Sequence, residues 1–116
     1  MRRREAERQG RRAEAAAAMW LRLFGWRILA RRARTPAGEV DIVARRGRTV
    51  AFIEVKGRAT AAAADLALDE YRLRRVAAAA EALAARYARP GDAIRIDAMF
   101  VVPRRLPRHL PNVWIG

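Results

Sequence analysis

The chain has 116 residues, no cysteine, a single histidine and a formal net charge of +13, which together fit one domain and favour a polyanionic partner. The absence of cysteine and serine excludes disulfides, thiolate zinc sites and cysteine or serine nucleophiles, and one histidine excludes a multi-histidine metal centre. Carboxylates, lysine and arginine remain for catalysis, a set that suits Mg²⁺ or Mn²⁺.

Nucleic acid, an anionic membrane surface and an acidic protein are the polyanions that such a charge would attract. No apolar run approaches the ~20 residues that a membrane span requires, and the basic amino terminus lacks the apolar segment of a secretory signal. The lack of cysteine is compatible with a reducing compartment. We therefore expect a cytoplasmic protein without a membrane partner.

The amino-terminal part of the chain predicts a flexible basic segment followed by a helix. Residues 1–9 are polar and arginine-rich, and residues 10–116 are expected to form the single domain. Apolar residues recur at three- and four-residue spacing over residues 10–24, and Gly25 is typical of the position that ends a helix. Glu14 lies next to the apolar stripe, where its simplest role is a solvated pair with a nearby arginine. The expected stripe consists of Ala13, Ala16, Ala17, Trp20, Leu23 and Phe24.

A strand and a β-hairpin follow this helix. Residues 26–33 alternate loosely and predict the first strand. Residues 38–58 predict a hairpin with two apolar strands, residues 40–44 and 50–55. The turn between them contains Gly47, which supplies the positive φ that a tight hairpin turn needs.

Charged residues interrupt the apolar strands of this hairpin. Side chains alternate along a strand, so Glu39, Asp41 and Val43 should share one face, and Glu54 and Lys56 should share one face. If the register brings these faces together, Asp41, Glu54 and Lys56 converge on one spot. Carboxylates in such strands are unfavourable unless something pairs with them, and a divalent cation with a lysine beside it would do so.

The plainer interpretation of this pattern is an exposed Glu54–Lys56 pair, which would contribute little to stability. Lys56 is, however, the only lysine among 25 basic residues. Lysine presents a compact ammonium, whereas arginine presents a larger planar group. This single exception favours a chemical role for Lys56.

The carboxyl-terminal half predicts a long helix over residues 65–88, a strand over residues 93–102 and a short edge strand over residues 113–115. Arginines near the first turns of the helix form a solvated face or hold phosphates with their planar guanidinium groups. Asp97 is expected to pair with an arginine, and His109 is expected to lie at the surface. The core stripe of the helix is expected to contain Leu66, Leu73, Val76, Ala80, Leu83, Ala84 and Tyr87.

The hairpin motifs, GEVD at residues 38–41 and FIEVKGR at residues 52–58, resemble the GEID…FVEVKTR pattern of the YraN family of small bacterial proteins. That family is similar to the archaeal Holliday-junction resolvases and belongs with the PD-(D/E)xK nuclease fold. The resemblance covers most of the chain. Its further matches are Gly10, Glu14, residues 25–31, Arg34 and residues 95–97. The chain departs from the pattern where Gly57 replaces threonine, Arg32 replaces asparagine and Arg72 replaces lysine.

The resemblance implies an α/β protein with a restriction-endonuclease-like α/β/α sandwich and a mixed central sheet. It implies a Mg²⁺ or Mn²⁺ ion bound by Asp41, Glu54 and the carbonyl of Val55. The expected catalytic residues are Glu14, Asp41, Glu54 and Lys56. The expected partner is nucleic acid, above all DNA. The side chains expected to bind it are Arg34, Arg58, Arg72 and Arg75.

The expected function is metal-dependent cleavage of phosphodiester bonds, including those of branched or damaged DNA. A non-catalytic nucleic-acid-binding module of the same fold is the alternative. A structural protein bound to an acidic partner is a third class, which the hairpin carboxylates disfavour. The resolvase resemblance also makes a homodimer a reasonable expectation.

Overall fold

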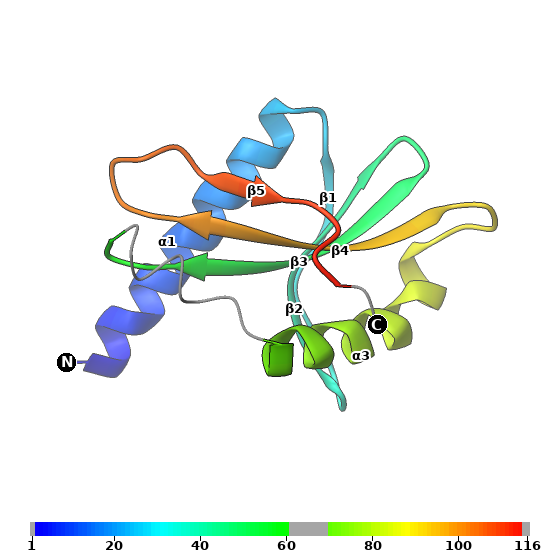
Figure 1. Ribbon diagram of the computed structural model, residues 1–116, viewed down its shortest axis with the longest axis horizontal. Helices are drawn as coiled ribbons and strands as arrows, with labels where there is room; N and C mark the ends of the chain where they lie inside the picture. The colour runs from blue at the N-terminus through cyan, green and yellow to red at the C-terminus, as the bar shows by residue number, and fades with distance from the viewer. Residues whose placement is uncertain (1, 61–69, 115–116) are drawn as a thin grey trace.

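The computed structural model describes residues 2–60 and 70–114 of the chain, which form a mixed five-stranded sheet with one helix against each face (Figure 1). The sheet order is β1-β2-β3-β4-β5, and only β3 and β4 run parallel. This arrangement confirms the expected α/β/α sandwich with a mixed sheet. The elements are α1 (Arg2–Leu23), β1 (Arg27–Thr35), β2 (Gly38–Arg46), β3 (Thr49–Gly57), α3 (Glu70–Tyr87), β4 (Ala93–Val101) and β5 (Arg108–Leu110).

The β2–β3 hairpin forms the centre of the sheet, as its sequence predicts. Gly47 in the turn has a φ of 60°. Val43 pairs with Phe52, and both pack in the core beneath α3. Ile42 pairs with Ile53, and both pack in the core beneath α1. The hairpin is therefore apolar on both faces, because each face is covered by a helix.

Helix α1 ends where predicted but starts earlier and presents a different face. It begins at Arg2 rather than Gly10. At its end, the N–H of Trp26 donates to the carbonyl of Leu21 over 2.9 Å, and Gly25 has a φ of 87°. This is a Schellman cap, in which the hydrophobic pair is Trp26 with Leu21.

The expected stripe of α1 is only partly correct. Ala13 and Ala17 are buried, but Leu23 and Phe24 are exposed by 73% and 56%. Ala18 and Leu21 take their places against the sheet. The apolar pattern was ambiguous because alanines surround this part of the helix, so several faces have similar hydrophobicity.

The crossover helix α3 covers the other face of the sheet. The structure describes it from Glu70, so the expected helical residues 65–69, Leu66 among them, lie outside the described residues. Pro90 and Gly91 follow its carboxyl end, as expected. Its buried side chains are Leu73, Val76, Ala79, Ala80 and Leu83.

The tail differs from the expected edge strand at residues 113–115. The edge strand is β5, which pairs antiparallel with Ala98–Phe100 of β4. Val113 makes a single backbone hydrogen bond to Ile96, and Ile115 lies outside the described residues. The apolar side chains of this segment suggested a strand, but Val113 and Trp114 pack against the core instead.

His109 is partly buried and bound to a buried carboxylate, whereas a surface position was expected. Its Nε2 lies 2.7 Å from Oδ2 of the fully buried Asp97. Arg95 donates to both oxygens of Asp97 over 2.9 Å, and the N–H of Asn112 donates to Oδ1. Burial acts to raise the pKa of Asp97, but the hydrogen bonds from His109 and Arg95 hold that pKa below its usual value. The expected Asp97–arginine pair is confirmed.

Helix α1 approaches β3 most closely at Gly57. A β-carbon added at Gly57 would lie 2.5 Å from the β-carbon of Ala13. The threonine of the YraN pattern would therefore not fit here without a shift of α1. The absence of a side chain at residue 57 sets how closely α1 packs beside the carboxylates of the hairpin.

Gly57→Ala is expected to lower the free energy of unfolding by about 1–3 kcal/mol, because it overpacks the contact with α1. The double variant with Ala13→Gly should recover part of this loss, although glycine itself weakens a helix by about 1 kcal/mol. Urea unfolding of the two single variants and the double variant measures the coupling. Equal effects of Gly57→Ala with and without Ala13→Gly would contradict a steric contact.

No helix in the part of the chain that the structure describes is long and apolar enough to cross a membrane.

Candidate functional site

Asp41 lies where the hydrogen-bonded pairing of β2 with β3 ends. That pairing runs from Arg46–Thr49 to Ile42–Ile53. Beyond it, Oδ2 of Asp41 accepts a hydrogen bond of 2.7 Å from the N–H of Val55. The Asp41 carboxylate thus takes the place of a backbone acceptor and is held at the level of Glu54.

Glu54 and Lys56 form an enclosed pair on the same strand. Nζ of Lys56 lies 3.1 Å from Oε1 of Glu54, and their side chains are exposed by only 3% and 13%. The interpretation as an exposed pair is therefore wrong. A buried ion pair is sensitive to the loss of either partner, because the remaining charge has no compensation.

The surroundings of Asp41 disfavour its charge. Burial, and then the charge of Glu54, raise the pKa of Asp41 from 3.8 to about 7, although the N–H of Val55 and the ammonium of Lys56 act in the opposite direction. Glu14 also raises this pKa through its charge. A cation bound between Asp41 and Glu54 would relieve this repulsion.

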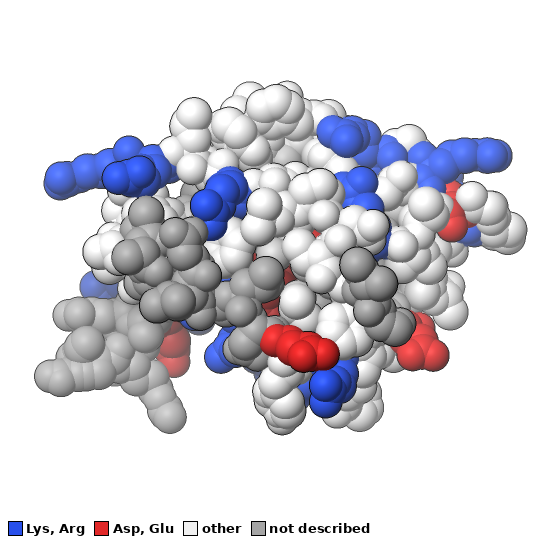
Figure 2. Space-filling model, viewed as in Figure 1, with Lys and Arg blue, Asp and Glu red and all other residues white. Residues whose placement is uncertain are grey.

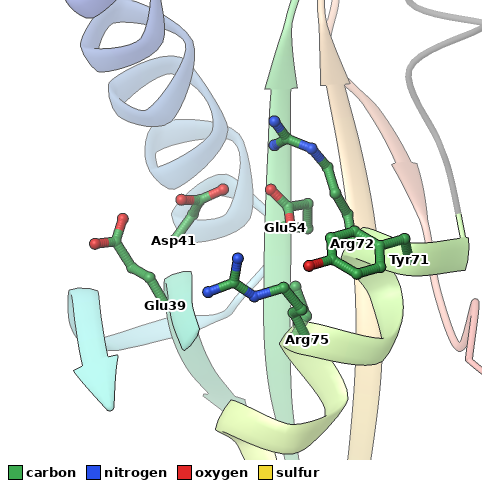
Figure 3. Close-up of a pocket in the computed structure, with 7 residues that line it drawn as sticks. Glu39, Asp41, Glu54, Tyr71, Arg72 and Arg75 are labelled. Atoms are coloured by element: carbon green, nitrogen blue, oxygen red, sulfur yellow. The ribbon is translucent and has the colours of Figure 1, made fainter. Parts of the chain in front are cut away.

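The carboxylates border two pockets of about 370 and 380 Å³. In the first, Glu39 and Asp41 of β2 and Glu54 of β3 face side chains that enter from the first turns of α3 (Figure 3). Asp41, Glu54 and Arg72 line both pockets. The α3 side chains of the first pocket are Tyr71, Arg72, Arg75 and Val76, and the second pocket extends to Gln9, Gly10, Lys56 and Arg58.

Basic side chains occur at several separate places on the surface rather than in one patch. Figure 2 shows this distribution on one face, with acidic side chains at other places in its lower and right parts. The sequence carries 25 basic and 12 acidic residues. This distribution produces a broad positive field around the recessed carboxylates.

The model of a family described as "Uncharacterised protein family UPF0102" matches residues 13–101 of this sequence. The chain belongs to the UPF0102 family. A UPF0102 protein of Sphingopyxis alaskensis is 70% identical over 114 residues, which cover 98% of both chains. A UPF0102 protein of Rhizorhabdus wittichii is 62% identical over 115 residues, which cover 99% of this chain and 98% of the relative. The resemblance to small YraN-like bacterial proteins is confirmed at the level of the family.

The matched region of the UPF0102 chain contains Glu14, which lies beside the site rather than in its pockets. It is buried, with 6% of the residue exposed. Its carboxylate accepts hydrogen bonds from Nε of Arg31 and Nε of Arg32, over 3.0 and 3.2 Å. The simple pairing with an arginine is thus observed, but across to β1 rather than along the helix. The catalytic role of Glu14 stays a prediction.

Arg32 has a strained backbone next to Asp41. Its φ is 53°, in the left-handed region. The pairs Arg31–Ile42 and Ala33–Val40 place it beside Asp41. Asparagine, the usual residue of the YraN pattern here, adopts this conformation more readily than arginine does.

The expectation that side chains alternate strictly between the two faces of β2 is wrong near Asp41. Val40 and Val43 both pack in the core beneath α3, although they are three positions apart. The side chains of Glu39, Asp41 and Val43 therefore do not form one regular face. Glu39 and Asp41, which are two positions apart, nevertheless line one pocket.

The four arginines expected to bind nucleic acid divide into two groups. Arg72 and Arg75 line the pocket of Figure 3, and Arg58 lines the second pocket while donating to the carbonyl of Gly57 over 2.8 Å. Arg34 is 82% exposed and pairs with Glu39 over 2.8 Å, at the margin of the site. Three of the four thus border the two carboxylates.

The donor set of the UPF0102 site fits a hard divalent cation. Asp41 and Glu54 offer carboxylate oxygens, which Mg²⁺ and Mn²⁺ prefer. Within residues 2–60 and 70–114, no group of three Asp, Glu or His side chains gathers around one point. Two carboxylates are enough for Mg²⁺ when waters and substrate phosphate supply the other ligands.

Sequence reasoning missed three residues of the site. Tyr71 lines the pocket with 66% of its surface exposed, and Gln9 and Gly10 line the second pocket. Helical periodicity could have placed Tyr71 beside Arg72 and Arg75. Gln9 gave no signal, because residues 1–9 were expected to be flexible.

Proposed function

We propose that this UPF0102 protein is a Mg²⁺- or Mn²⁺-dependent nuclease that acts on cytoplasmic DNA, including branched or damaged DNA. One observation carries the proposal. The carboxylates of Asp41 and Glu54 are partly buried and line both of two adjacent pockets that also contain arginine side chains. The enclosed ammonium of Lys56 pairs with Glu54 beside them. Chemistry on a phosphodiester needs this combination of a cation site and fixed positive charge.

Asp41, Glu54 and the carbonyl of Val55 would hold the metal ion. When bound, such an ion polarises a phosphate oxygen and lowers the pKa of a water molecule. The hydrogen bond from Val55 keeps the Asp41 carboxylate fixed, and Lys56 keeps Glu54 oriented at 3.1 Å. Lys56 orients the attacking water or stabilises charge that develops on the phosphate.

The arginines bind the polymer on either side of the reacting phosphate. Arg72 and Arg75 approach from α3, and Arg58 approaches from the end of β3. The planar guanidinium group matches two phosphate oxygens at once. A homodimer would place two such sites on a branched substrate, and sedimentation of the purified protein with and without DNA tests this part of the proposal.

The test of cleavage uses labelled linear, flapped and four-way DNA with Mn²⁺ or with EDTA. Cleavage in Mn²⁺ that EDTA abolishes supports the nuclease. A variant with Asp41→Asn controls for a contaminating nuclease, because it removes a metal ligand and keeps the charge of the rest of the surface.

A non-catalytic nucleic-acid-binding module is the second candidate. The observation that favours it is the two-carboxylate set itself, since the described residues gather no third acidic or histidine side chain there. This module would bind the same DNA molecules with the same arginines and would leave them intact in Mn²⁺.

Either candidate predicts binding that depends strongly on salt, because the net charge of +13 acts mainly on phosphates. The logarithm of affinity for duplex DNA should fall linearly with the logarithm of salt concentration, by about 0.9 per phosphate neutralised. Fluorescence anisotropy between low and moderate salt should give a slope equivalent to several phosphates. An affinity that does not change with salt would contradict both candidates.

A further inference from the structure

A third pocket lies at the other end of α1 from the carboxylates. It has a volume of about 410 Å³ and lies between the end of α1, the end of β2 and β5. Neither Asp41 nor Glu54 lines it, and no acidic side chain is among its lining residues. Its lining includes three aromatic side chains, Trp20, Phe24 and Trp26, and three basic ones, Arg46, Arg108 and His109.

The aromatic side chains are only partly used by the fold. Trp26 is buried, with the guanidinium groups of Arg46 and Arg95 at 4.5 and 5.3 Å from its ring centre. Trp20 and Phe24 lie 4.8 Å apart with their rings tilted by 48°, and 56% of Phe24 is exposed. Phe24 thus offers an aromatic surface that the core does not need.

The charge at this aromatic surface is held in place. Nη1 of Arg46 donates to the carbonyl of Phe24 over 3.2 Å while the guanidinium lies over Trp26. The nearby Asp97 is already paired with the guanidinium of Arg95. Its negative charge therefore does not cancel the attraction of Arg46 for an anion.

We propose that this pocket binds an unpaired nucleotide, with the base against Trp20 and Phe24 and the phosphate on Arg46. A planar aromatic group next to a fixed guanidinium is the combination that binds single-stranded nucleic acid, because every base has a face that can stack. A base in a duplex is already stacked and cannot enter. The inference concerns binding only, and it holds whether or not Asp41 and Glu54 cleave DNA.

The position of the aromatic pocket sets how many nucleotides a single nucleic-acid strand needs to reach both this pocket and the carboxylates. Gly10 lines a pocket of the carboxylates, Phe24 lines the aromatic pocket, and α1 connects them (Figure 1). At about 1.5 Å per helical residue the separation along α1 is roughly 20 Å. At the spacing of one strand of a DNA duplex, about 3.4 Å per nucleotide, roughly six nucleotides cover this distance, and a more extended single strand needs fewer.

The experiment measures the affinity of fluorescein-labelled oligothymidylates of 4 and 12 nucleotides by anisotropy in EDTA, with a 12-base-pair duplex as comparison. Phe24→Leu keeps an apolar side chain and removes the aromatic face, so it should weaken binding of the 12-mer about tenfold. Phe24→Trp should keep the affinity of the wild type. Leu23→Ala is the matched control, because Leu23 is 73% exposed and lies outside the pocket.

The outcomes separate this inference from the proposed nuclease. Loss with Phe24→Leu for the 12-mer but not for the duplex supports the pocket, even if no DNA is cleaved. An unchanged affinity of the Phe24→Leu variant for the 12-mer overturns the inference, even if the site that contains Asp41 cleaves DNA. A change in sedimentation with Phe24→Leu, together with unchanged affinity, would instead make this surface a contact between protein chains and also overturn the inference.

Discussion

Lys56→Arg is expected to reduce cleavage by about a hundredfold or more while DNA affinity stays close to that of the wild type. Lys56 is 3% exposed and its ammonium is fixed 3.1 Å from Glu54. A guanidinium is larger and planar, so it cannot occupy the same enclosed position without displacing the Glu54 carboxylate. Lys56→Ala should reduce cleavage to a similar extent, because it removes the charge that faces the phosphate.

The measurements are cleavage rate and dissociation constant at one salt concentration, with a melting curve for each variant. Arg74→Lys is a matched control, because Arg74 is 66% exposed and pairs only with Glu70 among the described residues. If Lys56 merely anchored a phosphate, Lys56→Arg would be tolerated and Lys56→Ala would weaken binding. A wild-type cleavage rate for Lys56→Arg would therefore contradict the catalytic role.

Asp41→Asn is expected to abolish the stabilisation of the protein by Mn²⁺. At a metal concentration of about 100 times the dissociation constant, binding to the native state contributes about 2.7 kcal/mol. For a domain of this size, that raises the melting temperature on the order of 10 °C. Glu81→Gln is the control, because Glu81 is an exposed acid outside both pockets of the carboxylates. An equal shift in wild type and Asp41→Asn would refute the assignment of the ligand.

Asp41→Asn should also change how the free energy of unfolding depends on pH in the absence of metal. The pKa of Asp41 is raised from 3.8 to about 7 in the folded chain, so the folded state binds this proton more tightly than the unfolded state. The contribution of Asp41 to stability is therefore greatest below pH 4 and falls as pH rises to about 7. Asp41→Asn should remove this decline, and the Mn²⁺ effect in wild type should be larger at pH 8 than at pH 5.5, because the ligand must be deprotonated.

The sequence was sufficient for the hairpin and its charged residues, because a turn glycine and alternating apolar residues act over short distances. The sequence made the convergence of Asp41, Glu54 and Lys56 conditional on the hairpin register, which it left open, and the three residues line one pocket in the structure. The faces of α1 could not be predicted in full, since alanines give several faces similar hydrophobicity. The alternating pattern of β1 gave no signal for the left-handed Arg32, which lies beside Asp41.

The tail was harder to predict because its structure depends on a distant charge. His109 and Asn112 are 12 and 15 residues from Asp97, and nothing in the local pattern joins them. Buried Asp97 takes two hydrogen bonds from Arg95 on its own strand, and its remaining partners, His109 and Asn112, belong to a segment that contains prolines and alternates poorly. Long-range satisfaction of a buried carboxylate is a property of the folded chain that a local pattern does not encode.

The Asp97 network also decides how fast the tail exchanges with solvent. The amide of Asn112 belongs to no helix or strand, yet it donates over 2.9 Å to a carboxylate that is fully buried. Deuterium can replace its hydrogen only when the tail separates from β4, which breaks the contact of His109 with Asp97 at the same time. The amide of Asn112 should therefore exchange as slowly as those of the sheet, while the exposed loop before β5 exchanges quickly. A segment without regular structure would then share the opening of the sheet's core, because a hydrogen bond to a buried carboxylate holds it beside the strand pairing of β5.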